Sequence, residues 1–237
     1  MKKIFALLLS AALLVTLLAA CGGGNTTDTD TDTQEPAADA STTQVEEQEP
    51  DTGDASKDDP LNQDEIGEKE LLVVSFGTSY NDSRRETIGA IEKAMQTAFP
   101  DYSVRRAFTS QIIIDHVKDR DGVTIDNVEQ ALERAVNNGV KTLVVQPTHL
   151  MNGLEYKELT DELAKYSDSF EKIAIGDPLL TSDADFEAVM TAITDATKDA
   201  ADGKTAICFM GHGTTADSNS VYSKMQTLLT DKGFNDY

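Results

Sequence analysis

The chain has 237 residues, a formal net charge of −22 and two cysteines. Such acidity argues against nucleic acid or an anionic surface as a partner, because phosphate groups are bound through clustered Lys and Arg. The length is enough for one domain of ordinary size with additional segments.

The first 21 residues are typical of a secretory leader. Lys2 and Lys3 form a basic start, residues 4–18 are apolar, and residues 18–21, Leu-Ala-Ala-Cys, have the form of a bacterial lipobox. By that resemblance, cleavage before Cys21 and lipid attachment to its sulfur would leave an exported protein anchored to the extracytoplasmic face of the cell membrane. An ordinary cleaved signal peptide and an uncleaved anchor helix are the alternatives.

Residues 22–68 have the composition of an acidic, disordered tether. They are rich in Gly, Thr, Asp, Glu and Pro and contain few large apolar residues, so they cannot bury enough surface to offset their ordering entropy. Between residues 22 and 70, sixteen acidic residues against Lys57 and Lys69 account for −14 of the −22. Self-repulsion is expected to keep this segment extended.

From Leu71 onward, apolar runs alternate with stretches of helical periodicity. This rhythm predicts an α/β fold in which right-handed crossovers join the strands of a parallel sheet. We expect strands over residues 71–76, 103–109, 140–147 and 171–175, and a fifth strand over residues 205–210. Helices are expected from Ser83, over residues 111–117, from Asp126, over residues 155–166, from Asp183 or Asp185, and over residues 218–230. Ser83 with Glu86 has the spacing of a capping box.

The runs 71–79 and 206–215 share one form, an apolar stretch that ends in Gly-Thr-Ser or Gly-Thr-Thr. Aligning them places Phe76 opposite His212, which indicates one half-fold used twice, with a reactive side chain in the second copy. Ligands bind at the carboxyl ends of parallel strands, so His212 is expected at a binding edge. Once Cys21 is lipidated, Cys208 has no disulfide partner, and its apolar surroundings favour a core position over a nucleophile.

Several motifs, taken in order, resemble the anaerobic cobaltochelatase family that metallates sirohydrochlorin, the CbiK type. They begin with Leu-Val-Val-Ser-Phe-Gly-Thr-Ser-Tyr (72–80), Arg-Ala-Phe-Thr-Ser (106–110), Arg-Asp-Gly (120–122) and Gln-Pro-Thr-His (146–149). Asn-Gly-Leu-Glu-Tyr (152–156), Pro-Leu-Leu (178–180) and Phe-Met-Gly-His-Gly (209–213) complete the set. The resemblance implies two flavodoxin-like lobes across a cleft, related to class II chelatases. It also implies insertion of Co²⁺, as substrate metal, into a tetrapyrrole without ATP, in anaerobic cobalamin biosynthesis.

The expected site combines a metal ligand, a base and groups that bind the macrocycle. His212 is the candidate ligand and proton acceptor, because neutral imidazole can do both and the flanking Gly211 and Gly213 allow close approach of a flat ring. The resemblance places the family's active-site glutamate at Glu155. His149 is left open between direct ligation and shaping of its loop. His116 is expected to be a solvated surface residue.

Hydroxyl groups in the loop after the first strand could bind the acid side chains of a tetrapyrrole, or could simply form the turn. These residues are Ser75, Thr78, Ser79 and Tyr80. Metal preference stays open, because imidazole and carboxylate serve cobalt, nickel, iron and zinc alike.

The resemblance also implies a second lobe that continues past Tyr237 and carries a further histidine in a Gly-Asp-His-like motif. We therefore expect an N-terminal lobe over residues 69–203 and an incomplete C-terminal lobe over residues 204–237. Either the chain is a fragment of a longer gene product, or it is a shortened protein that completes its cleft by pairing with a second copy. The predicted export motivates an alternative function, a lipoprotein that captures haem, another tetrapyrrole or a metal ion without turnover.

Overall fold

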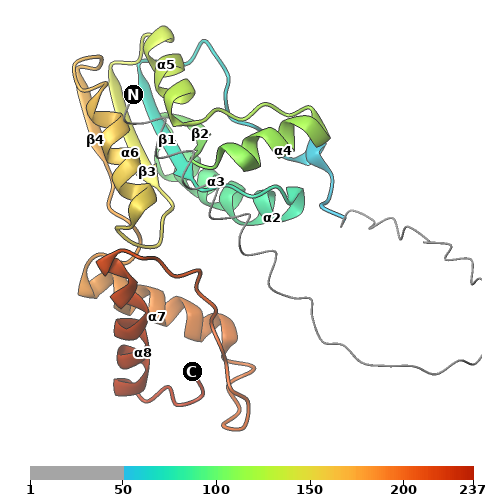
Figure 1. Cartoon of the computed structure of the whole chain (residues 1–237), viewed down its shortest axis with the longest axis vertical. Helices are drawn as coiled ribbons and strands as arrows, with labels where there is room; N and C mark the ends of the chain where they lie inside the picture. Colours follow the sequence, from blue (N-terminus) through green and yellow to red (C-terminus); the bar gives the residue numbers. More distant parts are fainter. Residues whose placement is uncertain (1–50) are drawn as a thin grey trace, which may run out of the picture. The chain divides into compact units, whose positions relative to one another are not determined.

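The structure is a computed structural model that describes residues 51–237. The predicted leader, Cys21 and the first part of the predicted tether lie outside the described residues. The described part is built on a four-stranded parallel sheet with strand order β2-β1-β3-β4 (Figure 1). Its strands are β1 (Lys69–Ser75), β2 (Ser103–Phe108), β3 (Thr142–Pro147) and β4 (Lys172–Ile175). The α/β class and the first four expected strands are thus confirmed.

Helices connect and follow these strands. They are α2 (Asn81–Glu86), α3 (Ile88–Ala98), α4 (Gln111–Asp121), α5 (Val128–Asn137), α6 (Leu154–Ala164), α7 (Asp183–Thr197) and α8 (Ser220–Asp231). Two short 3₁₀ turns, η1 (Ala55–Lys57) and η2 (Asp217–Asn219), are also present.

The central strand β1 is buried on both faces, as its unbroken apolar run predicts. Leu72 and Val74 belong to a core cluster that includes residues of α5 and α6, and Figure 1 shows these two helices beside the sheet. Leu71 and Val73 point to the opposite face, where Met95 of α3 packs against their cluster. Full burial of each such side chain stabilises the folded state by roughly 1.5–3 kcal/mol. This gain favours a central position in the sheet for the run.

The strands end together at one edge of the sheet. Ser75 at the end of β1 pairs with Phe108, and Val74 pairs with Pro147 at the end of β3. The loops that follow β1, β2, β3 and β4 therefore start from the same edge, where ligands bind in parallel α/β folds.

Two of the predicted helix starts are wrong in detail. Ser83 lies inside α2, and the expected long helix is divided at Thr87, which ends α2 and precedes α3. Asn127, and not Asp126, caps α5, in a capping box with Gln130. The carboxylate of Asp126 is instead occupied by ion pairs with Arg105 and Arg134, so it is not available to cap the helix.

Residues 51–68, which the composition assigns to the tether, pack against the lobe. The Asp58 carboxylate pairs with the Arg84 and Arg106 side chains, Leu61 is buried, and Ile66 packs against the main core. The ordered part of the chain thus begins before residue 69. Composition missed this because ion pairs and backbone hydrogen bonds to distant residues, together with two isolated apolar side chains, hold the segment, and none of these makes a periodic hydrophobic pattern.

The fifth strand expected over residues 205–210 is not formed, and these residues have no regular secondary structure. Cys208 is exposed and not in a core, and Met210 is 98% exposed. A strand needs a neighbour for its backbone groups, and the described residues offer this run only one backbone bond, from the Ile207 amide to the Asp236 carbonyl.

Helices α7 and α8 pack against each other across the expected lobe boundary at residues 203 and 204. Ser182 caps α7 in a capping box with Asp185, and Lys224 of α8 pairs with Asp183 and lies 4.1 Å from the ring centroid of Phe186. Among residues 51–237, no helix has both the length and the apolar character needed to cross a membrane.

Candidate functional site

A cavity of about 400 Å³ opens at the carboxyl edge of the sheet. Its lining comes from the loops after β1 and β3, from the first turn of α6, and from residues 212–222. Phe76, His149, Glu155, His212 and Tyr222 all contribute to it. The cavity thus brings together three residues that the sequence analysis singled out for metal chemistry.

His149 follows β3, and its backbone is held on two sides. The neighbouring Thr148 amide donates to the Val74 carbonyl at 2.8 Å, and the Leu179 amide donates to the His149 carbonyl at 3.0 Å. Both ring nitrogens are buried and have no hydrogen-bond partner. A buried polar group without a partner is costly, so these nitrogens are the strongest sign in the cavity of a missing ligand.

Burial lowers the pKa of His149, and the nearby Glu155 carboxylate opposes this shift without reversing it. The imidazole is therefore neutral at neutral pH, the form that can bind a metal ion or accept a proton. Nothing in the sequence distinguished His149 from a loop-shaping residue, because burial of its ring depends on the loops packed around it.

Glu155 lies in the first turn of α6, where the helix dipole favours a carboxylate. Gly153 caps this helix, and a Cβ added there would lie 3.6 Å from Glu155 Oε2 and 3.9 Å from Thr214 Oγ1. The α6 start and the loop after His212 therefore approach each other closely at one wall of the cavity.

His212 is exposed at the cavity and is carried by an irregular segment instead of a strand end. A Cβ at Gly211 would collide with the Tyr222 ring, and the Gly213 amide, at φ +79°, donates to the Tyr222 hydroxyl at 3.2 Å. Packing of Tyr222 is thus one reason for glycine at position 211, and the close approach of a macrocycle to Gly211 and Gly213 stays a prediction.

The hydroxyl residues in the loop after β1 differ in their exposure and in their hydrogen bonds. Ser75 is buried, and its Oγ accepts a hydrogen bond from Thr148 Oγ1 at 2.8 Å, so it ties β1 to β3. Thr78 Oγ1 accepts from the Tyr80 amide at 3.2 Å, which makes Thr78 a turn former. Ser79 is half-buried and Tyr80 is exposed.

The three candidates share a cavity but do not form a closed metal site. Within residues 51–237, no three His, Cys, Asp or Glu side chains converge closely enough to hold an ion. His116 lies exposed on α4, as expected of a surface histidine.

Comparison with known proteins gives matches over the same region. The family model described as "Cobalt chelatase (CbiK)" matches residues 69–237. The sirohydrochlorin cobaltochelatase of Salmonella typhimurium is 34% identical over 166 residues, which cover 70% of this chain and 62% of that protein. The sirohydrochlorin cobaltochelatase CbiKC of Nitratidesulfovibrio vulgaris is 29% identical over 163 residues, which cover 68% and 57%.

The chain thus spans about six-tenths of the length of these curated relatives. Among solved structures, a CbiX protein from Marinobacter aquaeolei matches with 13% identity and a TM-score of 0.37, over 56% of this chain and 97% of that one.

Proposed function

Because the chain belongs to the cobalt chelatase (CbiK) family, we propose that it inserts Co²⁺ into sirohydrochlorin or a related tetrapyrrole without ATP, in anaerobic cobalamin biosynthesis. The observation that carries this proposal is the pair of unpartnered ring nitrogens of His149, in a cavity that Glu155 and His212 also line. The two relatives of known activity are sirohydrochlorin cobaltochelatases, which supports the choice of metal and macrocycle.

Metal insertion displaces two pyrrole N–H protons and transfers a divalent ion from protein or water to the macrocycle. In the proposed mechanism, neutral His149 accepts one of the two protons, Glu155 stabilises the imidazolium that results, and the second proton is released to solvent at the open side of the cavity. His212, exposed beside the cavity, meets the incoming ion as an imidazole ligand, with Glu155 as the carboxylate partner. An incomplete ligand set suits an ion that must be released to the product.

The test is cobalt insertion by the full gene product, followed by absorption of the metallated tetrapyrrole. Replacing a general base typically costs a factor of roughly 10²–10⁴, so His149→Ala is expected to lower kcat by about that factor. His212→Ala and Glu155→Gln are expected to lower it as well. His116→Ala is the matched control, because that exposed histidine lies on α4 and away from the cavity lining.

The pH profile sharpens the assignment of the base. Since burial lowers the pKa of His149, the acid limb of kcat/KM is expected below the ordinary histidine value of 6.5. Glu155 raises that pKa, so Glu155→Gln is expected to move the acid limb to still lower pH. A folded His149→Ala variant with wild-type turnover would remove His149 from the mechanism.

The second candidate function is capture of haem, another tetrapyrrole or a metal ion, without turnover. The leader-like residues 1–21 favour it, because export would separate the protein from substrates made inside the cell. Titration with haem and with sirohydrochlorin, each with and without Co²⁺, separates the two functions. Stoichiometric binding with no metallated product would favour capture.

The location is also part of the proposal. Cleavage before Cys21 and lipidation of its sulfur would anchor the protein to the extracytoplasmic face of the membrane. Cys21→Ala is expected to abolish lipid labelling and to release the protein from the membrane fraction, whereas Cys208→Ala is expected to change neither. Retention of the Cys21→Ala protein with unchanged labelling would contradict the anchor.

The proposal also includes pairing of the protein with a second copy of itself. Phe209 and Met210 are apolar and exposed, and no strand among the described residues pairs with them. Exposed apolar side chains favour contact with another protein surface, here a second copy of the chain. Sedimentation of the full chain measures this directly, and a monomer at all concentrations would exclude it.

A further inference from the structure

Residues 51–66, here called the strap, are built onto the lobe by specific backbone contacts. Along the outer edge of β2, the Leu61 carbonyl accepts from the Arg106 amide at 3.1 Å. At the start of α2, the Thr52 carbonyl accepts from the Asp82 amide at 3.0 Å, and the Gly53 carbonyl accepts from Asn81 Nδ2 at 3.1 Å. The strap thus touches both the sheet edge and the helix that follows the β1 loop.

Two strap residues, Leu61 and Glu65, have backbone conformations that are unfavourable by themselves. Leu61 has φ +49°, a region that costs a non-glycine residue free energy. Gly53 has φ +87°, and a Cβ there would collide with the Asp82 carboxylate. Such conformations persist only where surrounding contacts compensate for them, so the strap is a fitted part of the lobe.

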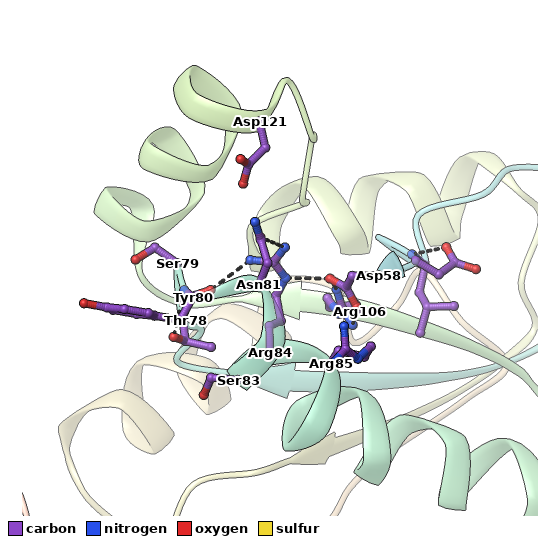
Figure 2. A network of polar contacts seen from close by, with 12 residues as sticks. Asp58, Thr78, Ser79, Tyr80, Asn81, Ser83, Arg84, Arg85, Arg106 and Asp121 are labelled. Atoms are coloured by element: carbon purple, nitrogen blue, oxygen red, sulfur yellow. Dashed lines mark hydrogen bonds and ion pairs between the residues drawn. The ribbon is translucent and has the colours of Figure 1, made fainter. Parts of the chain in front are cut away.

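The strap's Asp58 joins two buried arginines (Figure 2). Its Oδ2 accepts from Arg84 Nε at 2.5 Å and from Arg106 Nη1 at 2.7 Å, and its Oδ1 accepts from Arg106 Nη2 at 3.0 Å. The Arg84 side chain is 0% exposed and that of Asp58 is 5% exposed. Glu92 binds Arg106 from the other side, so two guanidinium groups face two carboxylates.

Removing Asp58 would leave one positive charge without a counter-charge in this buried cluster. Burial alone would raise the pKa of Asp58, but the hydrogen bonds from Arg106 and Arg84 outweigh it and hold that pKa below its ordinary value. The carboxylate is therefore charged at neutral pH, and it is the only acidic group of the described strap that contacts Arg84.

Arg84 carries this contact to the loop after β1. Its Nη1 donates to the Thr78 carbonyl at 3.1 Å, and its Nη2 donates to Asn81 Oδ1 at 2.6 Å. Arg120 Nη2 donates to the next carbonyl, that of Ser79, at 2.6 Å. Figure 2 shows Arg84 between Asp58 and this loop, with the Tyr80 side chain pointing away from the arginines.

We propose that Asp58 is a positioning residue which, through Arg84, holds the 77–80 loop in place for tetrapyrrole binding beside the cavity. The loop follows Phe76, which lines the cavity, and it carries the hydroxyl groups of Thr78, Ser79 and Tyr80. The strap precedes residues 69–237, the region that the family model matches. The contact from Asp58 through Arg84 to the loop therefore starts outside the matched region. The link to tetrapyrrole binding rests on the proposed function.

The first test is hydrogen exchange of the 76–82 amides in full-length Asp58→Asn. Loss of one hydrogen bond to a charged group predicts exchange roughly tenfold faster in this loop. Asp64→Asn is the matched control. Asp64 is also a strap residue whose carboxylate pairs with an arginine, Arg134, but its side chain is 65% exposed. Unchanged loop exchange in folded Asp58→Asn would overturn the proposal.

A second variant covers the case in which Asp58→Asn does not fold. Arg84→Met removes the connection to the loop while Asp58 keeps its two bonds to Arg106. It is expected to show the same faster exchange at residues 76–82. Wild-type exchange in Arg84→Met would equally overturn the proposal.

The final test compares KM with kcat for sirohydrochlorin. A loop that binds the macrocycle away from the reacting nitrogens predicts a KM raised roughly tenfold with kcat nearly unchanged, in both variants. A faster-exchanging loop with wild-type KM would refute the link to substrate. If wild-type protein neither binds nor metallates the tetrapyrrole, the proposed function fails, while the exchange data still decide whether Asp58 positions the loop.

Discussion

Two apolar runs of similar form have opposite fates in this molecule. Residues 71–75 form most of β1, which pairs with β2 on one side and β3 on the other and is covered on both faces. Residues 206–210 form no strand, and Met210 is almost fully exposed. The difference shows that an apolar run favours burial, but that it forms a strand only where neighbouring strands can pair with its backbone.

The largest expected effect comes from placing a carboxylate in each run. Val73→Asp would bury an unpaired charge at a fully buried position and is expected to cost more than about 4 kcal/mol, enough to prevent folding. Met210→Asp is expected to change the free energy of unfolding by less than about 0.5 kcal/mol. Urea unfolding followed by circular dichroism measures both. Strong destabilisation by Met210→Asp would show that the second run is covered in solution.

A second difference is that β1 contains a buried acid, Glu70, as its second residue. Burial raises the pKa of Glu70 to about 7, Asp126 adds to the shift, and Arg105 and Arg134 oppose it. Because the folded state holds this proton more tightly than the unfolded state, stability is full below about pH 4.5 and is lost as pH rises through about 7. By roughly 1.4 kcal/mol per pKa unit, the loss is on the order of 3 kcal/mol.

Glu70→Gln is expected to flatten this part of the stability profile. The measurement is the free energy of unfolding at several values between pH 5 and 8. Glu68→Gln is the control, because Glu68 is an exposed neighbour that pairs with Lys141. An unchanged slope in Glu70→Gln would assign the pH dependence to other groups.

Matched glycines after the two runs give the third prediction. Gly77 has φ +104°, and a Cβ there would lie 2.6 Å from the Phe108 ring, so Gly77→Ala combines backbone strain with collision and is expected to cost about 2–4 kcal/mol. Gly213 has φ +79° but open space, with its nearest neighbour at 3.7 Å. Gly213→Ala is therefore expected to cost only about 1 kcal/mol. Equal losses in thermal unfolding would contradict this ordering.

A small effect is also expected where α8 meets α7. Lys224 pairs with Asp183 and lies over the Phe186 ring, but both charged side chains are well exposed. Lys224→Ala is expected to cost less than about 1 kcal/mol, and less still at high salt. A salt-independent loss of several kcal/mol would show that this contact is more buried than the structure indicates.

The sheet could be predicted well and the site only in part. Strands β1, β3 and β4 follow from apolar runs, and β2 follows from the alternation of strands and helices. The motifs singled out Glu155 and His212, which line one cavity in the structure, although His212 lies on an irregular segment and not at a strand end. The unpartnered ring of His149 could not be foreseen, because its environment is a cavity that only the folded chain forms, from loops that are distant in the sequence. Helix caps were misplaced where Asp126 had a stronger partner in Arg134.

The sequence by itself determined the α/β class, the positions of four strands and the family, because these depend on periodicity and on short motifs. Only the tertiary structure decided which apolar run pairs, which histidine lies buried without a partner, and that residues 51–66 belong to the lobe. The physical reason is the same in all three cases. Three features depend on groups that are far apart in the chain: strand pairing, the burial of the His149 ring nitrogens, and the contacts of Asp58 with Arg84 and Arg106. A local sequence pattern therefore cannot predict them.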